Sequence, residues 1–128
     1  MPKQPRDLAQ LLIRKAEADL RSASLLLGGD DLVDPACFHI QQASEKLLKA
    51  LLASAGMAYP FTHDLGELLS LALVRFPALA GFSETLPVYS DFALATRYDE
   101  PVLPSREEAI EALETVKRLH ERVLAAML

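Results

Sequence analysis

The sequence predicts an all-α fold, an antiparallel up-down bundle of four to five helices. Apolar residues recur at helical spacing in three long segments, residues 6–27, 34–56 and 106–127, and no segment alternates as a strand does. Glycine, proline and capping residues mark the ends of these segments, and mostly short loops join them. Long amphipathic helices with short connections pack as antiparallel neighbours in a bundle.

The bulk composition predicts a single domain over residues 1–128, located in the cytoplasm. The chain has 128 residues, 51% of them apolar, a net charge of −5 and one cysteine, Cys37. This apolar content suffices for a modest core, and one cysteine excludes an internal disulfide. No signal-peptide pattern and no run of about 20 apolar residues is present, so we expect no membrane segment. The acidic balance disfavours RNA and other nucleic acids as non-specific partners.

The first predicted helix runs from about Arg6 to Leu27, and Gly28-Gly29 ends it. Asp19 lies beside its apolar stripe. We expect this carboxylate to lie at the boundary of the core and to pair with a lysine or arginine of a neighbouring helix. The stripe itself consists of Leu8, Leu12, Ala16, Leu20, Ala23 and Leu27.

The second predicted helix occupies Asp34–Gly56, with the aspartate as N-cap, Pro35 in the first turn and the glycine just past the end. Its apolar stripe consists of Ala36, Ile40, Ala43, Leu47, Ala50 and Leu51. A polar row near the edge of that stripe consists of Gln42, Glu45, Lys46 and Lys49. Glu45 and Lys49 are four positions apart and can pair on one helix. The row can therefore face water, a partner or a ligand.

A third helix is predicted from Asp64 to about Arg75, with Thr62 as its N-cap and His63 at its start. The apolar segment Phe76–Ala95 follows, and its first part, up to Pro87, has an irregular pattern. We expect this segment to form the contact of a homodimer, and the alternative is that it covers the bundle core.

Two further helices complete the predicted bundle. A short fourth helix spans about Pro87–Arg97, and prolines after it prevent its continuation. The last helix, about Arg106–Met127, opens with a capping box formed by Ser105 and Glu108. His120 falls on the apolar face of this helix, so we expect a core or interface histidine.

The common motifs of metal and phosphate chemistry are absent from the sequence. No glutamate has a histidine three positions later, as a di-iron bundle requires, and no P-loop, His-Glu-x-x-His or Gly-x-Gly-x-x-Gly occurs. Cys37 and His39 are two positions apart on a helix, so they point to different faces and do not form a nucleophile–base pair. We therefore expect no bound metal and no cofactor.

The candidate site residues are polar residues outside the usual solvated faces. Arg97 offers a planar donor fork for phosphate or carboxylate, and Tyr98 offers a stacking face. At the end of a helix, Arg97 can instead satisfy free backbone carbonyls. The predicted phosphate- or ligand-binding residues are Lys46, Lys49, His63, Arg97 and Tyr98. The predicted supporting polar network consists of Asp19, Gln42, Glu45 and Asp64.

Four stretches together resemble the HEPN domain, a small helical domain named for its occurrence in higher eukaryotes and prokaryotes. They are Ala16-Glu17-Ala18-Asp19-Leu20, the longer run Cys37–Leu51 (CFHIQQASEKLLKAL), Thr62-His63-Asp64-Leu65, and Arg97-Tyr98. The family usually shows Arg-Tyr-Pro at the last of these, whereas Asp99 follows here. The run from Cys37 to Leu51 is the most specific of the four.

The resemblance implies an up-down helical bundle that is commonly a homodimer. Bacterial and archaeal relatives are often paired with a minimal nucleotidyltransferase in two-component modules, some of them toxin–antitoxin systems. Other branches are metal-independent RNases, which use an arginine followed a few residues later by a histidine. Here no histidine follows Arg97 at that distance, and no other arginine has one four to seven positions later. The sequence thus departs from the RNase pattern.

Three functions from different classes remain open at this point. The first is a non-catalytic module that binds a nucleotide or holds the substrate of a partner nucleotidyltransferase. The second is an interaction protein in which a buried polar network forms inside the bundle or dimer, made by Gln42, Glu45, Lys49 and Arg97. The third is a metal-independent RNase in which His63 replaces the usual histidine and serves as acid or base.

Overall fold

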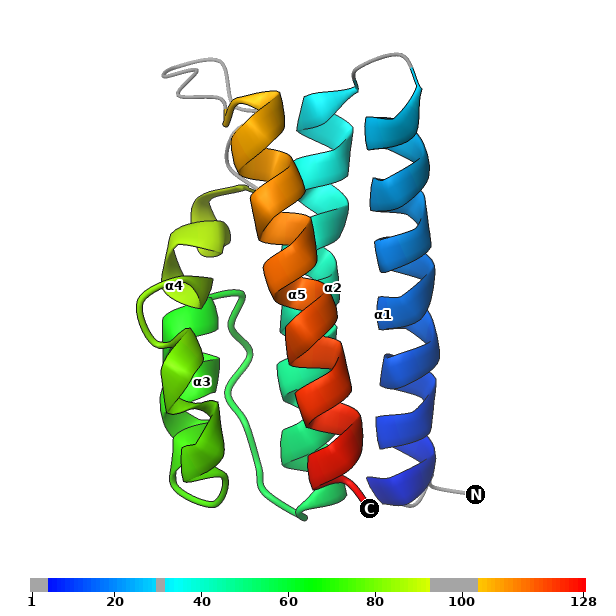
Figure 1. Cartoon of the computed structure of the whole chain (residues 1–128). Coiled ribbons are helices and arrows are strands. Elements are labelled where there is room, and N and C mark those ends of the chain that lie inside the picture. Colours follow the sequence, from blue (N-terminus) through cyan, green and yellow to red (C-terminus); the bar gives the residue numbers. More distant parts are fainter. Residues whose placement is uncertain (1–4, 30–31, 93–103) are drawn as a thin grey trace.

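The computed structural model describes residues 5–29, 32–92 and 104–128, and it confirms the all-α bundle. Figure 1 shows the two longest helices, α1 (Pro5–Gly28) and α2 (Val33–Ser54), side by side and antiparallel, as predicted, with α5 (Arg106–Ala126) along α2. α5 runs in the same direction as α2. Between them, residues 55–64 lead back along the bundle, α3 (Leu65–Leu73) reverses direction, and the 3₁₀ helix η1 (Pro77–Phe82) and α4 (Leu86–Tyr89) lead back again.

The pairing of α1 with α2 is built on small residues. Ala9, Ala16 and Ala23 recur every seven positions on α1, and all three are buried. Ala36, Ala43 and Ala50 do the same on α2. Residues seven apart lie on one face of a helix, and small side chains on that face let two helices approach closely. We call these two sets the alanine columns.

The larger core side chains come mainly from α2. Every residue of its predicted apolar stripe is fully buried. On α1 the stripe is displaced: Leu8 is exposed and Leu12 only partly buried, whereas Ile13 is buried. The α2 side chains meet a third layer from α5, whose buried residues include Val116, Leu119 and Val123.

The predicted N-cap of α2 is wrong by two positions, while the end of the helix is confirmed. The helix begins at Val33 with Leu32 as N-cap, because the amide of Ala36 already bonds to the carbonyl of Leu32 at 3.2 Å. Asp34 therefore lies in the first turn, where its charge complements the helix dipole. At the other end Gly56 adopts a positive φ of 70°, which suits glycine and closes the helix.

The predicted N-cap of α3 is also corrected. Asp64 caps the helix, because its carboxylate Oδ1 accepts hydrogen bonds from the amides of Gly66 at 2.9 Å and Glu67 at 3.2 Å. Thr62 instead accepts a bond from the Asp64 amide at 3.1 Å. A charged acceptor binds free amides more strongly than a hydroxyl does. α3 ends at Leu73, short of the expected Arg75.

The segment after α3 is more regular than predicted and covers the core. η1 and the four-residue α4 occupy most of it, and the predicted fourth helix beyond Phe92 lies outside the described residues. Four apolar side chains of its described part are buried: Leu79, Leu86, Tyr89 and Phe92. The covering role weighed in the sequence is therefore the one seen here. The homodimer stays a prediction.

The capping box of α5 is confirmed. The Glu108 amide donates to Ser105 Oγ at 3.1 Å, and the Ser105 amide donates to Glu108 Oε1 at 3.0 Å. The bond from the Ser105 amide lowers the pKa of the Glu108 carboxyl group, and the Ser105 side chain lowers it further. His120 is half-buried and bonds through Nε2 to Glu17 on α1 at 2.9 Å. Within the described ranges, no helix has the length and apolarity to span a bilayer.

Candidate functional site

The polar row of α2 is organised around Glu45, a buried carboxylate that is 6% exposed. Its Oε1 accepts a bond from Gln41 Nε2 at 3.1 Å and meets His63 Nδ1 at 2.8 Å. Its Oε2 accepts from Lys49 Nζ at 3.1 Å. Burial raises the pKa of Glu45, but the hydrogen bonds from His63, Lys49 and Gln41 outweigh it and leave the pKa below the usual value. Glu45 is therefore ionised at neutral pH.

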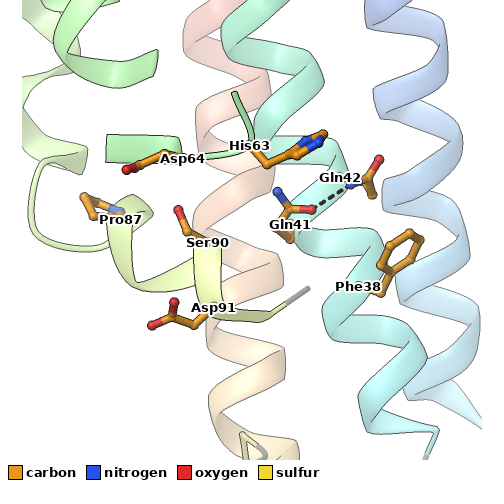
Figure 2. Close-up of a pocket in the computed structure, with 8 residues that line it drawn as sticks. All are labelled: Phe38, Gln41, Gln42, His63, Asp64, Pro87, Ser90 and Asp91. Atoms are coloured by element: carbon orange, nitrogen blue, oxygen red, sulfur yellow. Dashed lines mark hydrogen bonds between the residues drawn. The ribbon is translucent and has the colours of Figure 1, made fainter. Parts of the chain in front are cut away.

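The charge of Glu45 sets the direction of the hydrogen bonds around it. An ionised carboxylate only accepts, so Gln41 turns its amide nitrogen toward Glu45 and keeps its oxygen for Gln42 Nε2, at 2.7 Å. The oxygen of Gln42 then points away from Gln41 (Figure 2). In the same way His63 donates from Nδ1 to Glu45, and its Nε2 accepts a hydrogen bond only when the ring is neutral. Glu45 thus orients the Gln42 oxygen and the His63 ring.

A second carboxylate ties α1 to the same row. Asp19 is buried on α1, and it pairs with Lys46 Nζ at 2.6 Å and with His39 Nδ1 at 2.8 Å. The prediction that Asp19 pairs with a lysine of a neighbouring helix is confirmed. The histidine partner was not predicted, because it depends on a contact between helices that the sequence pattern of one helix does not contain.

A hollow of about 560 Å³ opens beside this row, between α2 and the α4 region. In Figure 2 Phe38, Gln41 and Gln42 lie on the α2 side, Pro87, Ser90 and Asp91 lie opposite, and His63 and Asp64 come from the segment before α3. The Phe38 ring is 42% exposed although it lines the hollow. Ser90 Oγ accepts from the Leu65 amide at 2.8 Å, which fixes the α4 side to the start of α3. We call this space the α2–α4 hollow.

The structure brings only some of the predicted site residues to the α2–α4 hollow. Gln42, His63 and Asp64 line it, with Asp64 also capping α3. Lys46 and Lys49 do not line it, because each is half-buried against a carboxylate, and Lys49 also lies 5.8 Å from the Tyr59 ring centre. Phosphate binding by Lys46 and Lys49 stays a prediction, and their pairing with carboxylates argues against it.

Arg97 and Tyr98 lie outside the described residues, so their predicted roles stay predictions. The sequence did not identify the five other lining residues, which are Phe38, Gln41, Pro87, Ser90 and Asp91. Phe38 had a usable signal, since it stands four positions before Gln42 on the same helix face. Asp91 had none, because only the tertiary fold brings it opposite α2.

The described lining of the α2–α4 hollow is rich in hydrogen-bond acceptors. It includes the carboxylates of Asp64 and Asp91 and contains no lysine or arginine. Elsewhere in the described part of the chain, no group of three or more histidine, cysteine or acidic side chains is placed to hold a metal ion. The α2–α4 hollow is therefore suited to a ligand that carries hydrogen-bond donors and a flat apolar surface.

The fold and the polar row together define the class of this protein. It is a small helical bundle whose second long helix carries buried and half-buried polar residues beside its apolar face. The family model of the HEPN domain matches residues 9–126, so the chain belongs to the HEPN family. The crystal structure of ST0689, an archaeal HEPN homologue, is similar with a TM-score of 0.69 and 24% sequence identity. That match covers 94% of this chain and 98% of the archaeal chain, and it establishes the fold. No curated protein matches this chain significantly.

Proposed function

We propose that this HEPN-family protein is a non-catalytic binding module that holds the nucleoside part of a nucleotide in the α2–α4 hollow. The observation that carries the proposal is the composition of the hollow: an exposed aromatic ring, two carboxamides and an imidazole around about 560 Å³. That volume lies within the usual range for small-molecule sites, roughly 300–1,000 Å³.

The α2 side of the hollow supplies the groups that recognise a base. Phe38 offers a partly exposed ring, and bases stack on such rings with little dependence on sequence. Gln42 presents its amide oxygen, and a carboxamide pairs well with the edge of an adenine. Because Gln42 is oriented through Gln41 by the charge of Glu45, this acceptor is in place before a ligand arrives. Preorganisation of this kind reduces the entropy cost of binding.

The other acceptors suit the ribose and the amino groups of a base. His63 Nε2 and the Asp91 carboxylate both accept hydrogen bonds, and ribose hydroxyls and exocyclic amines donate them. The phosphate of a nucleotide finds no cation among the described lining residues. The proposal therefore places the phosphate outside the hollow, and it retains Arg97 and Tyr98 as the predicted phosphate and stacking contacts.

The partner in this proposal is a minimal nucleotidyltransferase, in a cytoplasmic two-component module of the toxin–antitoxin kind, and the protein acts as a homodimer. Family membership supports this part of the proposal. Light scattering of the purified chain tests the dimer. Co-expression with the product of the adjacent reading frame tests the partner, which is rejected if that product is no nucleotidyltransferase or if the two proteins elute separately.

Calorimetry with adenosine and AMP tests the ligand. Phe38→Ala is expected to weaken adenosine binding roughly 5- to 100-fold, because stacking contributes about 1–3 kcal/mol per base. Phe61→Ala is the matched control, since Phe61 is a fully exposed phenylalanine that does not line the hollow. Arg97→Ala is expected to abolish the extra affinity of AMP over adenosine. Equal affinities in Phe38→Ala and Phe61→Ala would remove the nucleoside from this hollow.

A second candidate is an interaction protein without a ligand. The observation that favours it is the pairing of Lys46 with Asp19 and of Lys49 with Glu45, which commits the predicted phosphate-binding lysines to the interior. Under this alternative, neither adenosine nor AMP binds, and Lys46→Met lowers the melting temperature. Saturable binding of adenosine that depends on Phe38 would exclude it.

A further inference from the structure

A second and smaller hollow lies between η1 and α5, on elements that the proposed nucleoside site does not use. Its volume is about 240 Å³, below the usual range for whole small-molecule ligands, and this suits a small group. Two arginines and two threonines line it: Arg118 and Arg122 from α5, Thr115 from the same helix, and Thr85 from the segment before α4.

The two arginines share one face of α5. They are four positions apart, so their guanidinium groups lie on adjacent turns of the same face. Both residues are exposed. Like charges at this spacing repel each other, which raises the free energy of the empty site. An anion between the two groups removes that repulsion.

One arginine is held in position by the floor of the hollow. Thr115 is buried, its hydroxyl donates to the carbonyl of Glu111 at 3.0 Å, and its Oγ1 accepts from Arg118 Nη2 at 3.1 Å. A guanidinium has five N–H donors, so Arg118 keeps four for a ligand. Within the described part of the chain, neither Arg118 nor Arg122 forms an ion pair with a carboxylate. Lys46 and Lys49, by contrast, each form an ion pair with a carboxylate.

The opposite wall leaves room for a ligand. At Gly81 in η1, an added Cβ would meet no atom within 4 Å. Gly81 also lines the hollow. A side chain introduced there therefore adds a group at the edge of this space without a clash.

We propose that Arg118 and Arg122 form an oxyanion site for a phosphate group, carried either by inorganic phosphate or by a nucleotide. Planar guanidinium forks bind phosphate oxygens in a bidentate manner, which two lysines do not. The site is local, because the chain as a whole is acidic. It stands apart from the proposed function, which concerns the α2–α4 hollow.

The test is an NMR titration of the full chain in low-salt, phosphate-free buffer with inorganic phosphate, AMP and adenosine as separate probes. The backbone amides of Gly81 and Thr85 report on the η1–α5 hollow. The side-chain amide of Gln42 reports on the α2–α4 hollow. The two proposals therefore fail or succeed through different signals in one experiment.

We expect phosphate and AMP, but not adenosine, to shift the Gly81 and Thr85 amides. Arg118→Gln and Arg122→Gln should each weaken this binding about tenfold, the effect of one lost charge-assisted contact. Arg14→Gln, which changes an exposed arginine of α1 by the same charge, should leave it unchanged. Similar affinity for phosphate and AMP identifies the phosphate group alone as the ligand, and tighter binding of AMP identifies a nucleotide.

Gly81→Asp gives a second route to the same answer. It places a carboxylate beside the arginines without altering either of them, and it should abolish the phosphate-induced shifts. A site with a Kd of about 1 mM is nearly saturated at about 10 mM phosphate. The proposal is overturned if this concentration shifts neither the Gly81 amide nor the Thr85 amide of the parent protein. It is equally overturned if the double variant Arg118→Gln/Arg122→Gln, or Gly81→Asp, binds phosphate as the parent does.

Discussion

Replacing Glu45 by glutamine should destabilise this protein far more than the small change in shape suggests. Glutamine keeps the volume of the side chain but replaces one acceptor oxygen by a donor NH₂ and removes the charge. Lys49, Gln41 and His63 all direct donors at this carboxylate. At least one of these donors must then face another donor in a buried position.

The magnitude follows from the contacts and their exposure. Removing one partner of a buried ion pair costs about 3–5 kcal/mol, and each hydrogen bond to a charged group contributes about 1.5–3 kcal/mol. The His63 side chain is 75% exposed and Lys49 is 15% exposed, so water compensates part of the loss. We therefore expect a loss of about 2.5 kcal/mol in the free energy of unfolding. With about 2.1 cal/mol/K of unfolding entropy per residue, the 128 residues lose about 9 °C in Tm.

The assay is thermal and urea denaturation followed by circular dichroism at pH 7, with Glu114→Gln as the matched control. Glu114 also pairs with a lysine on its own helix, Lys117 at 3.5 Å, but its side chain is 57% exposed. That surface pair contributes about 0–1 kcal/mol, so its Tm should change by less than about 4 °C. If the two variants melt within about 3 °C of each other, a difference of less than about 1 kcal/mol, the buried contacts of Glu45 do not contribute the expected stability.

Four further predictions come from the same structure. Because the pKa of Glu45 is lowered in the folded state, its stabilising effect is present above the unfolded pKa and is lost as the pH falls through the lower folded value. The stability difference between the parent and Glu45→Gln should therefore shrink in urea titrations as the pH falls below about 4.5, the ordinary pKa of a glutamate, and parallel curves would refute this. Asp19→Asn should lower the free energy of unfolding by about 2 kcal/mol, and the exposed Asp7→Asn should lower it by less than about 1 kcal/mol. Equal losses on urea denaturation would argue against the pairing of Asp19 with Lys46 and His39. Burial, together with the charges of nearby acids, raises the pKa of Cys37 to about 11, so its reaction with a thiol reagent at pH 8 should be at least about a hundredfold slower than in urea. A fast reaction of the folded chain would contradict its burial. Finally, purified protein should leave RNA intact in the presence of a chelator, because no arginine has a histidine four to seven positions later; cleavage lost in His63→Ala would reverse this conclusion.

The sequence predicts the helices well because their signals are local. Periodic apolar residues, the capping box at Ser105 and the glycine after α2 act within one or two turns, and all appear in the structure. The N-cap of α3 was misplaced because Thr62 and Asp64 are both acceptable caps, and only the path of the incoming chain decides between them. The N-cap of α2 was misplaced because the residue in that position is Leu32, which makes no side-chain cap bond.

The site is less predictable because it depends on contacts between distant segments. Gln41 looks like a surface residue in the sequence, yet it is fully buried. Its burial is possible because its side-chain nitrogen donates to Glu45 and its side-chain oxygen accepts from Gln42. The pairing of His39 with Asp19 requires the relative position of two helices. The far wall of the α2–α4 hollow, with Ser90 and Asp91, comes from a segment about 50 positions along the chain from Phe38.

The alanine columns have a consequence for the register of α1 against α2. Because alanines recur every seven residues on both helices, sliding α1 by seven residues, about 10.5 Å, places alanine near alanine again. In either shifted arrangement the position of Asp19 is taken by Leu12 or Leu26, and Lys46 and His39 lose their carboxylate. The alanine columns alone distinguish these alignments poorly, whereas an unpaired half-buried lysine penalises the wrong ones. One carboxylate therefore contributes to the alignment of the two longest helices, and with it to the position of the whole polar row.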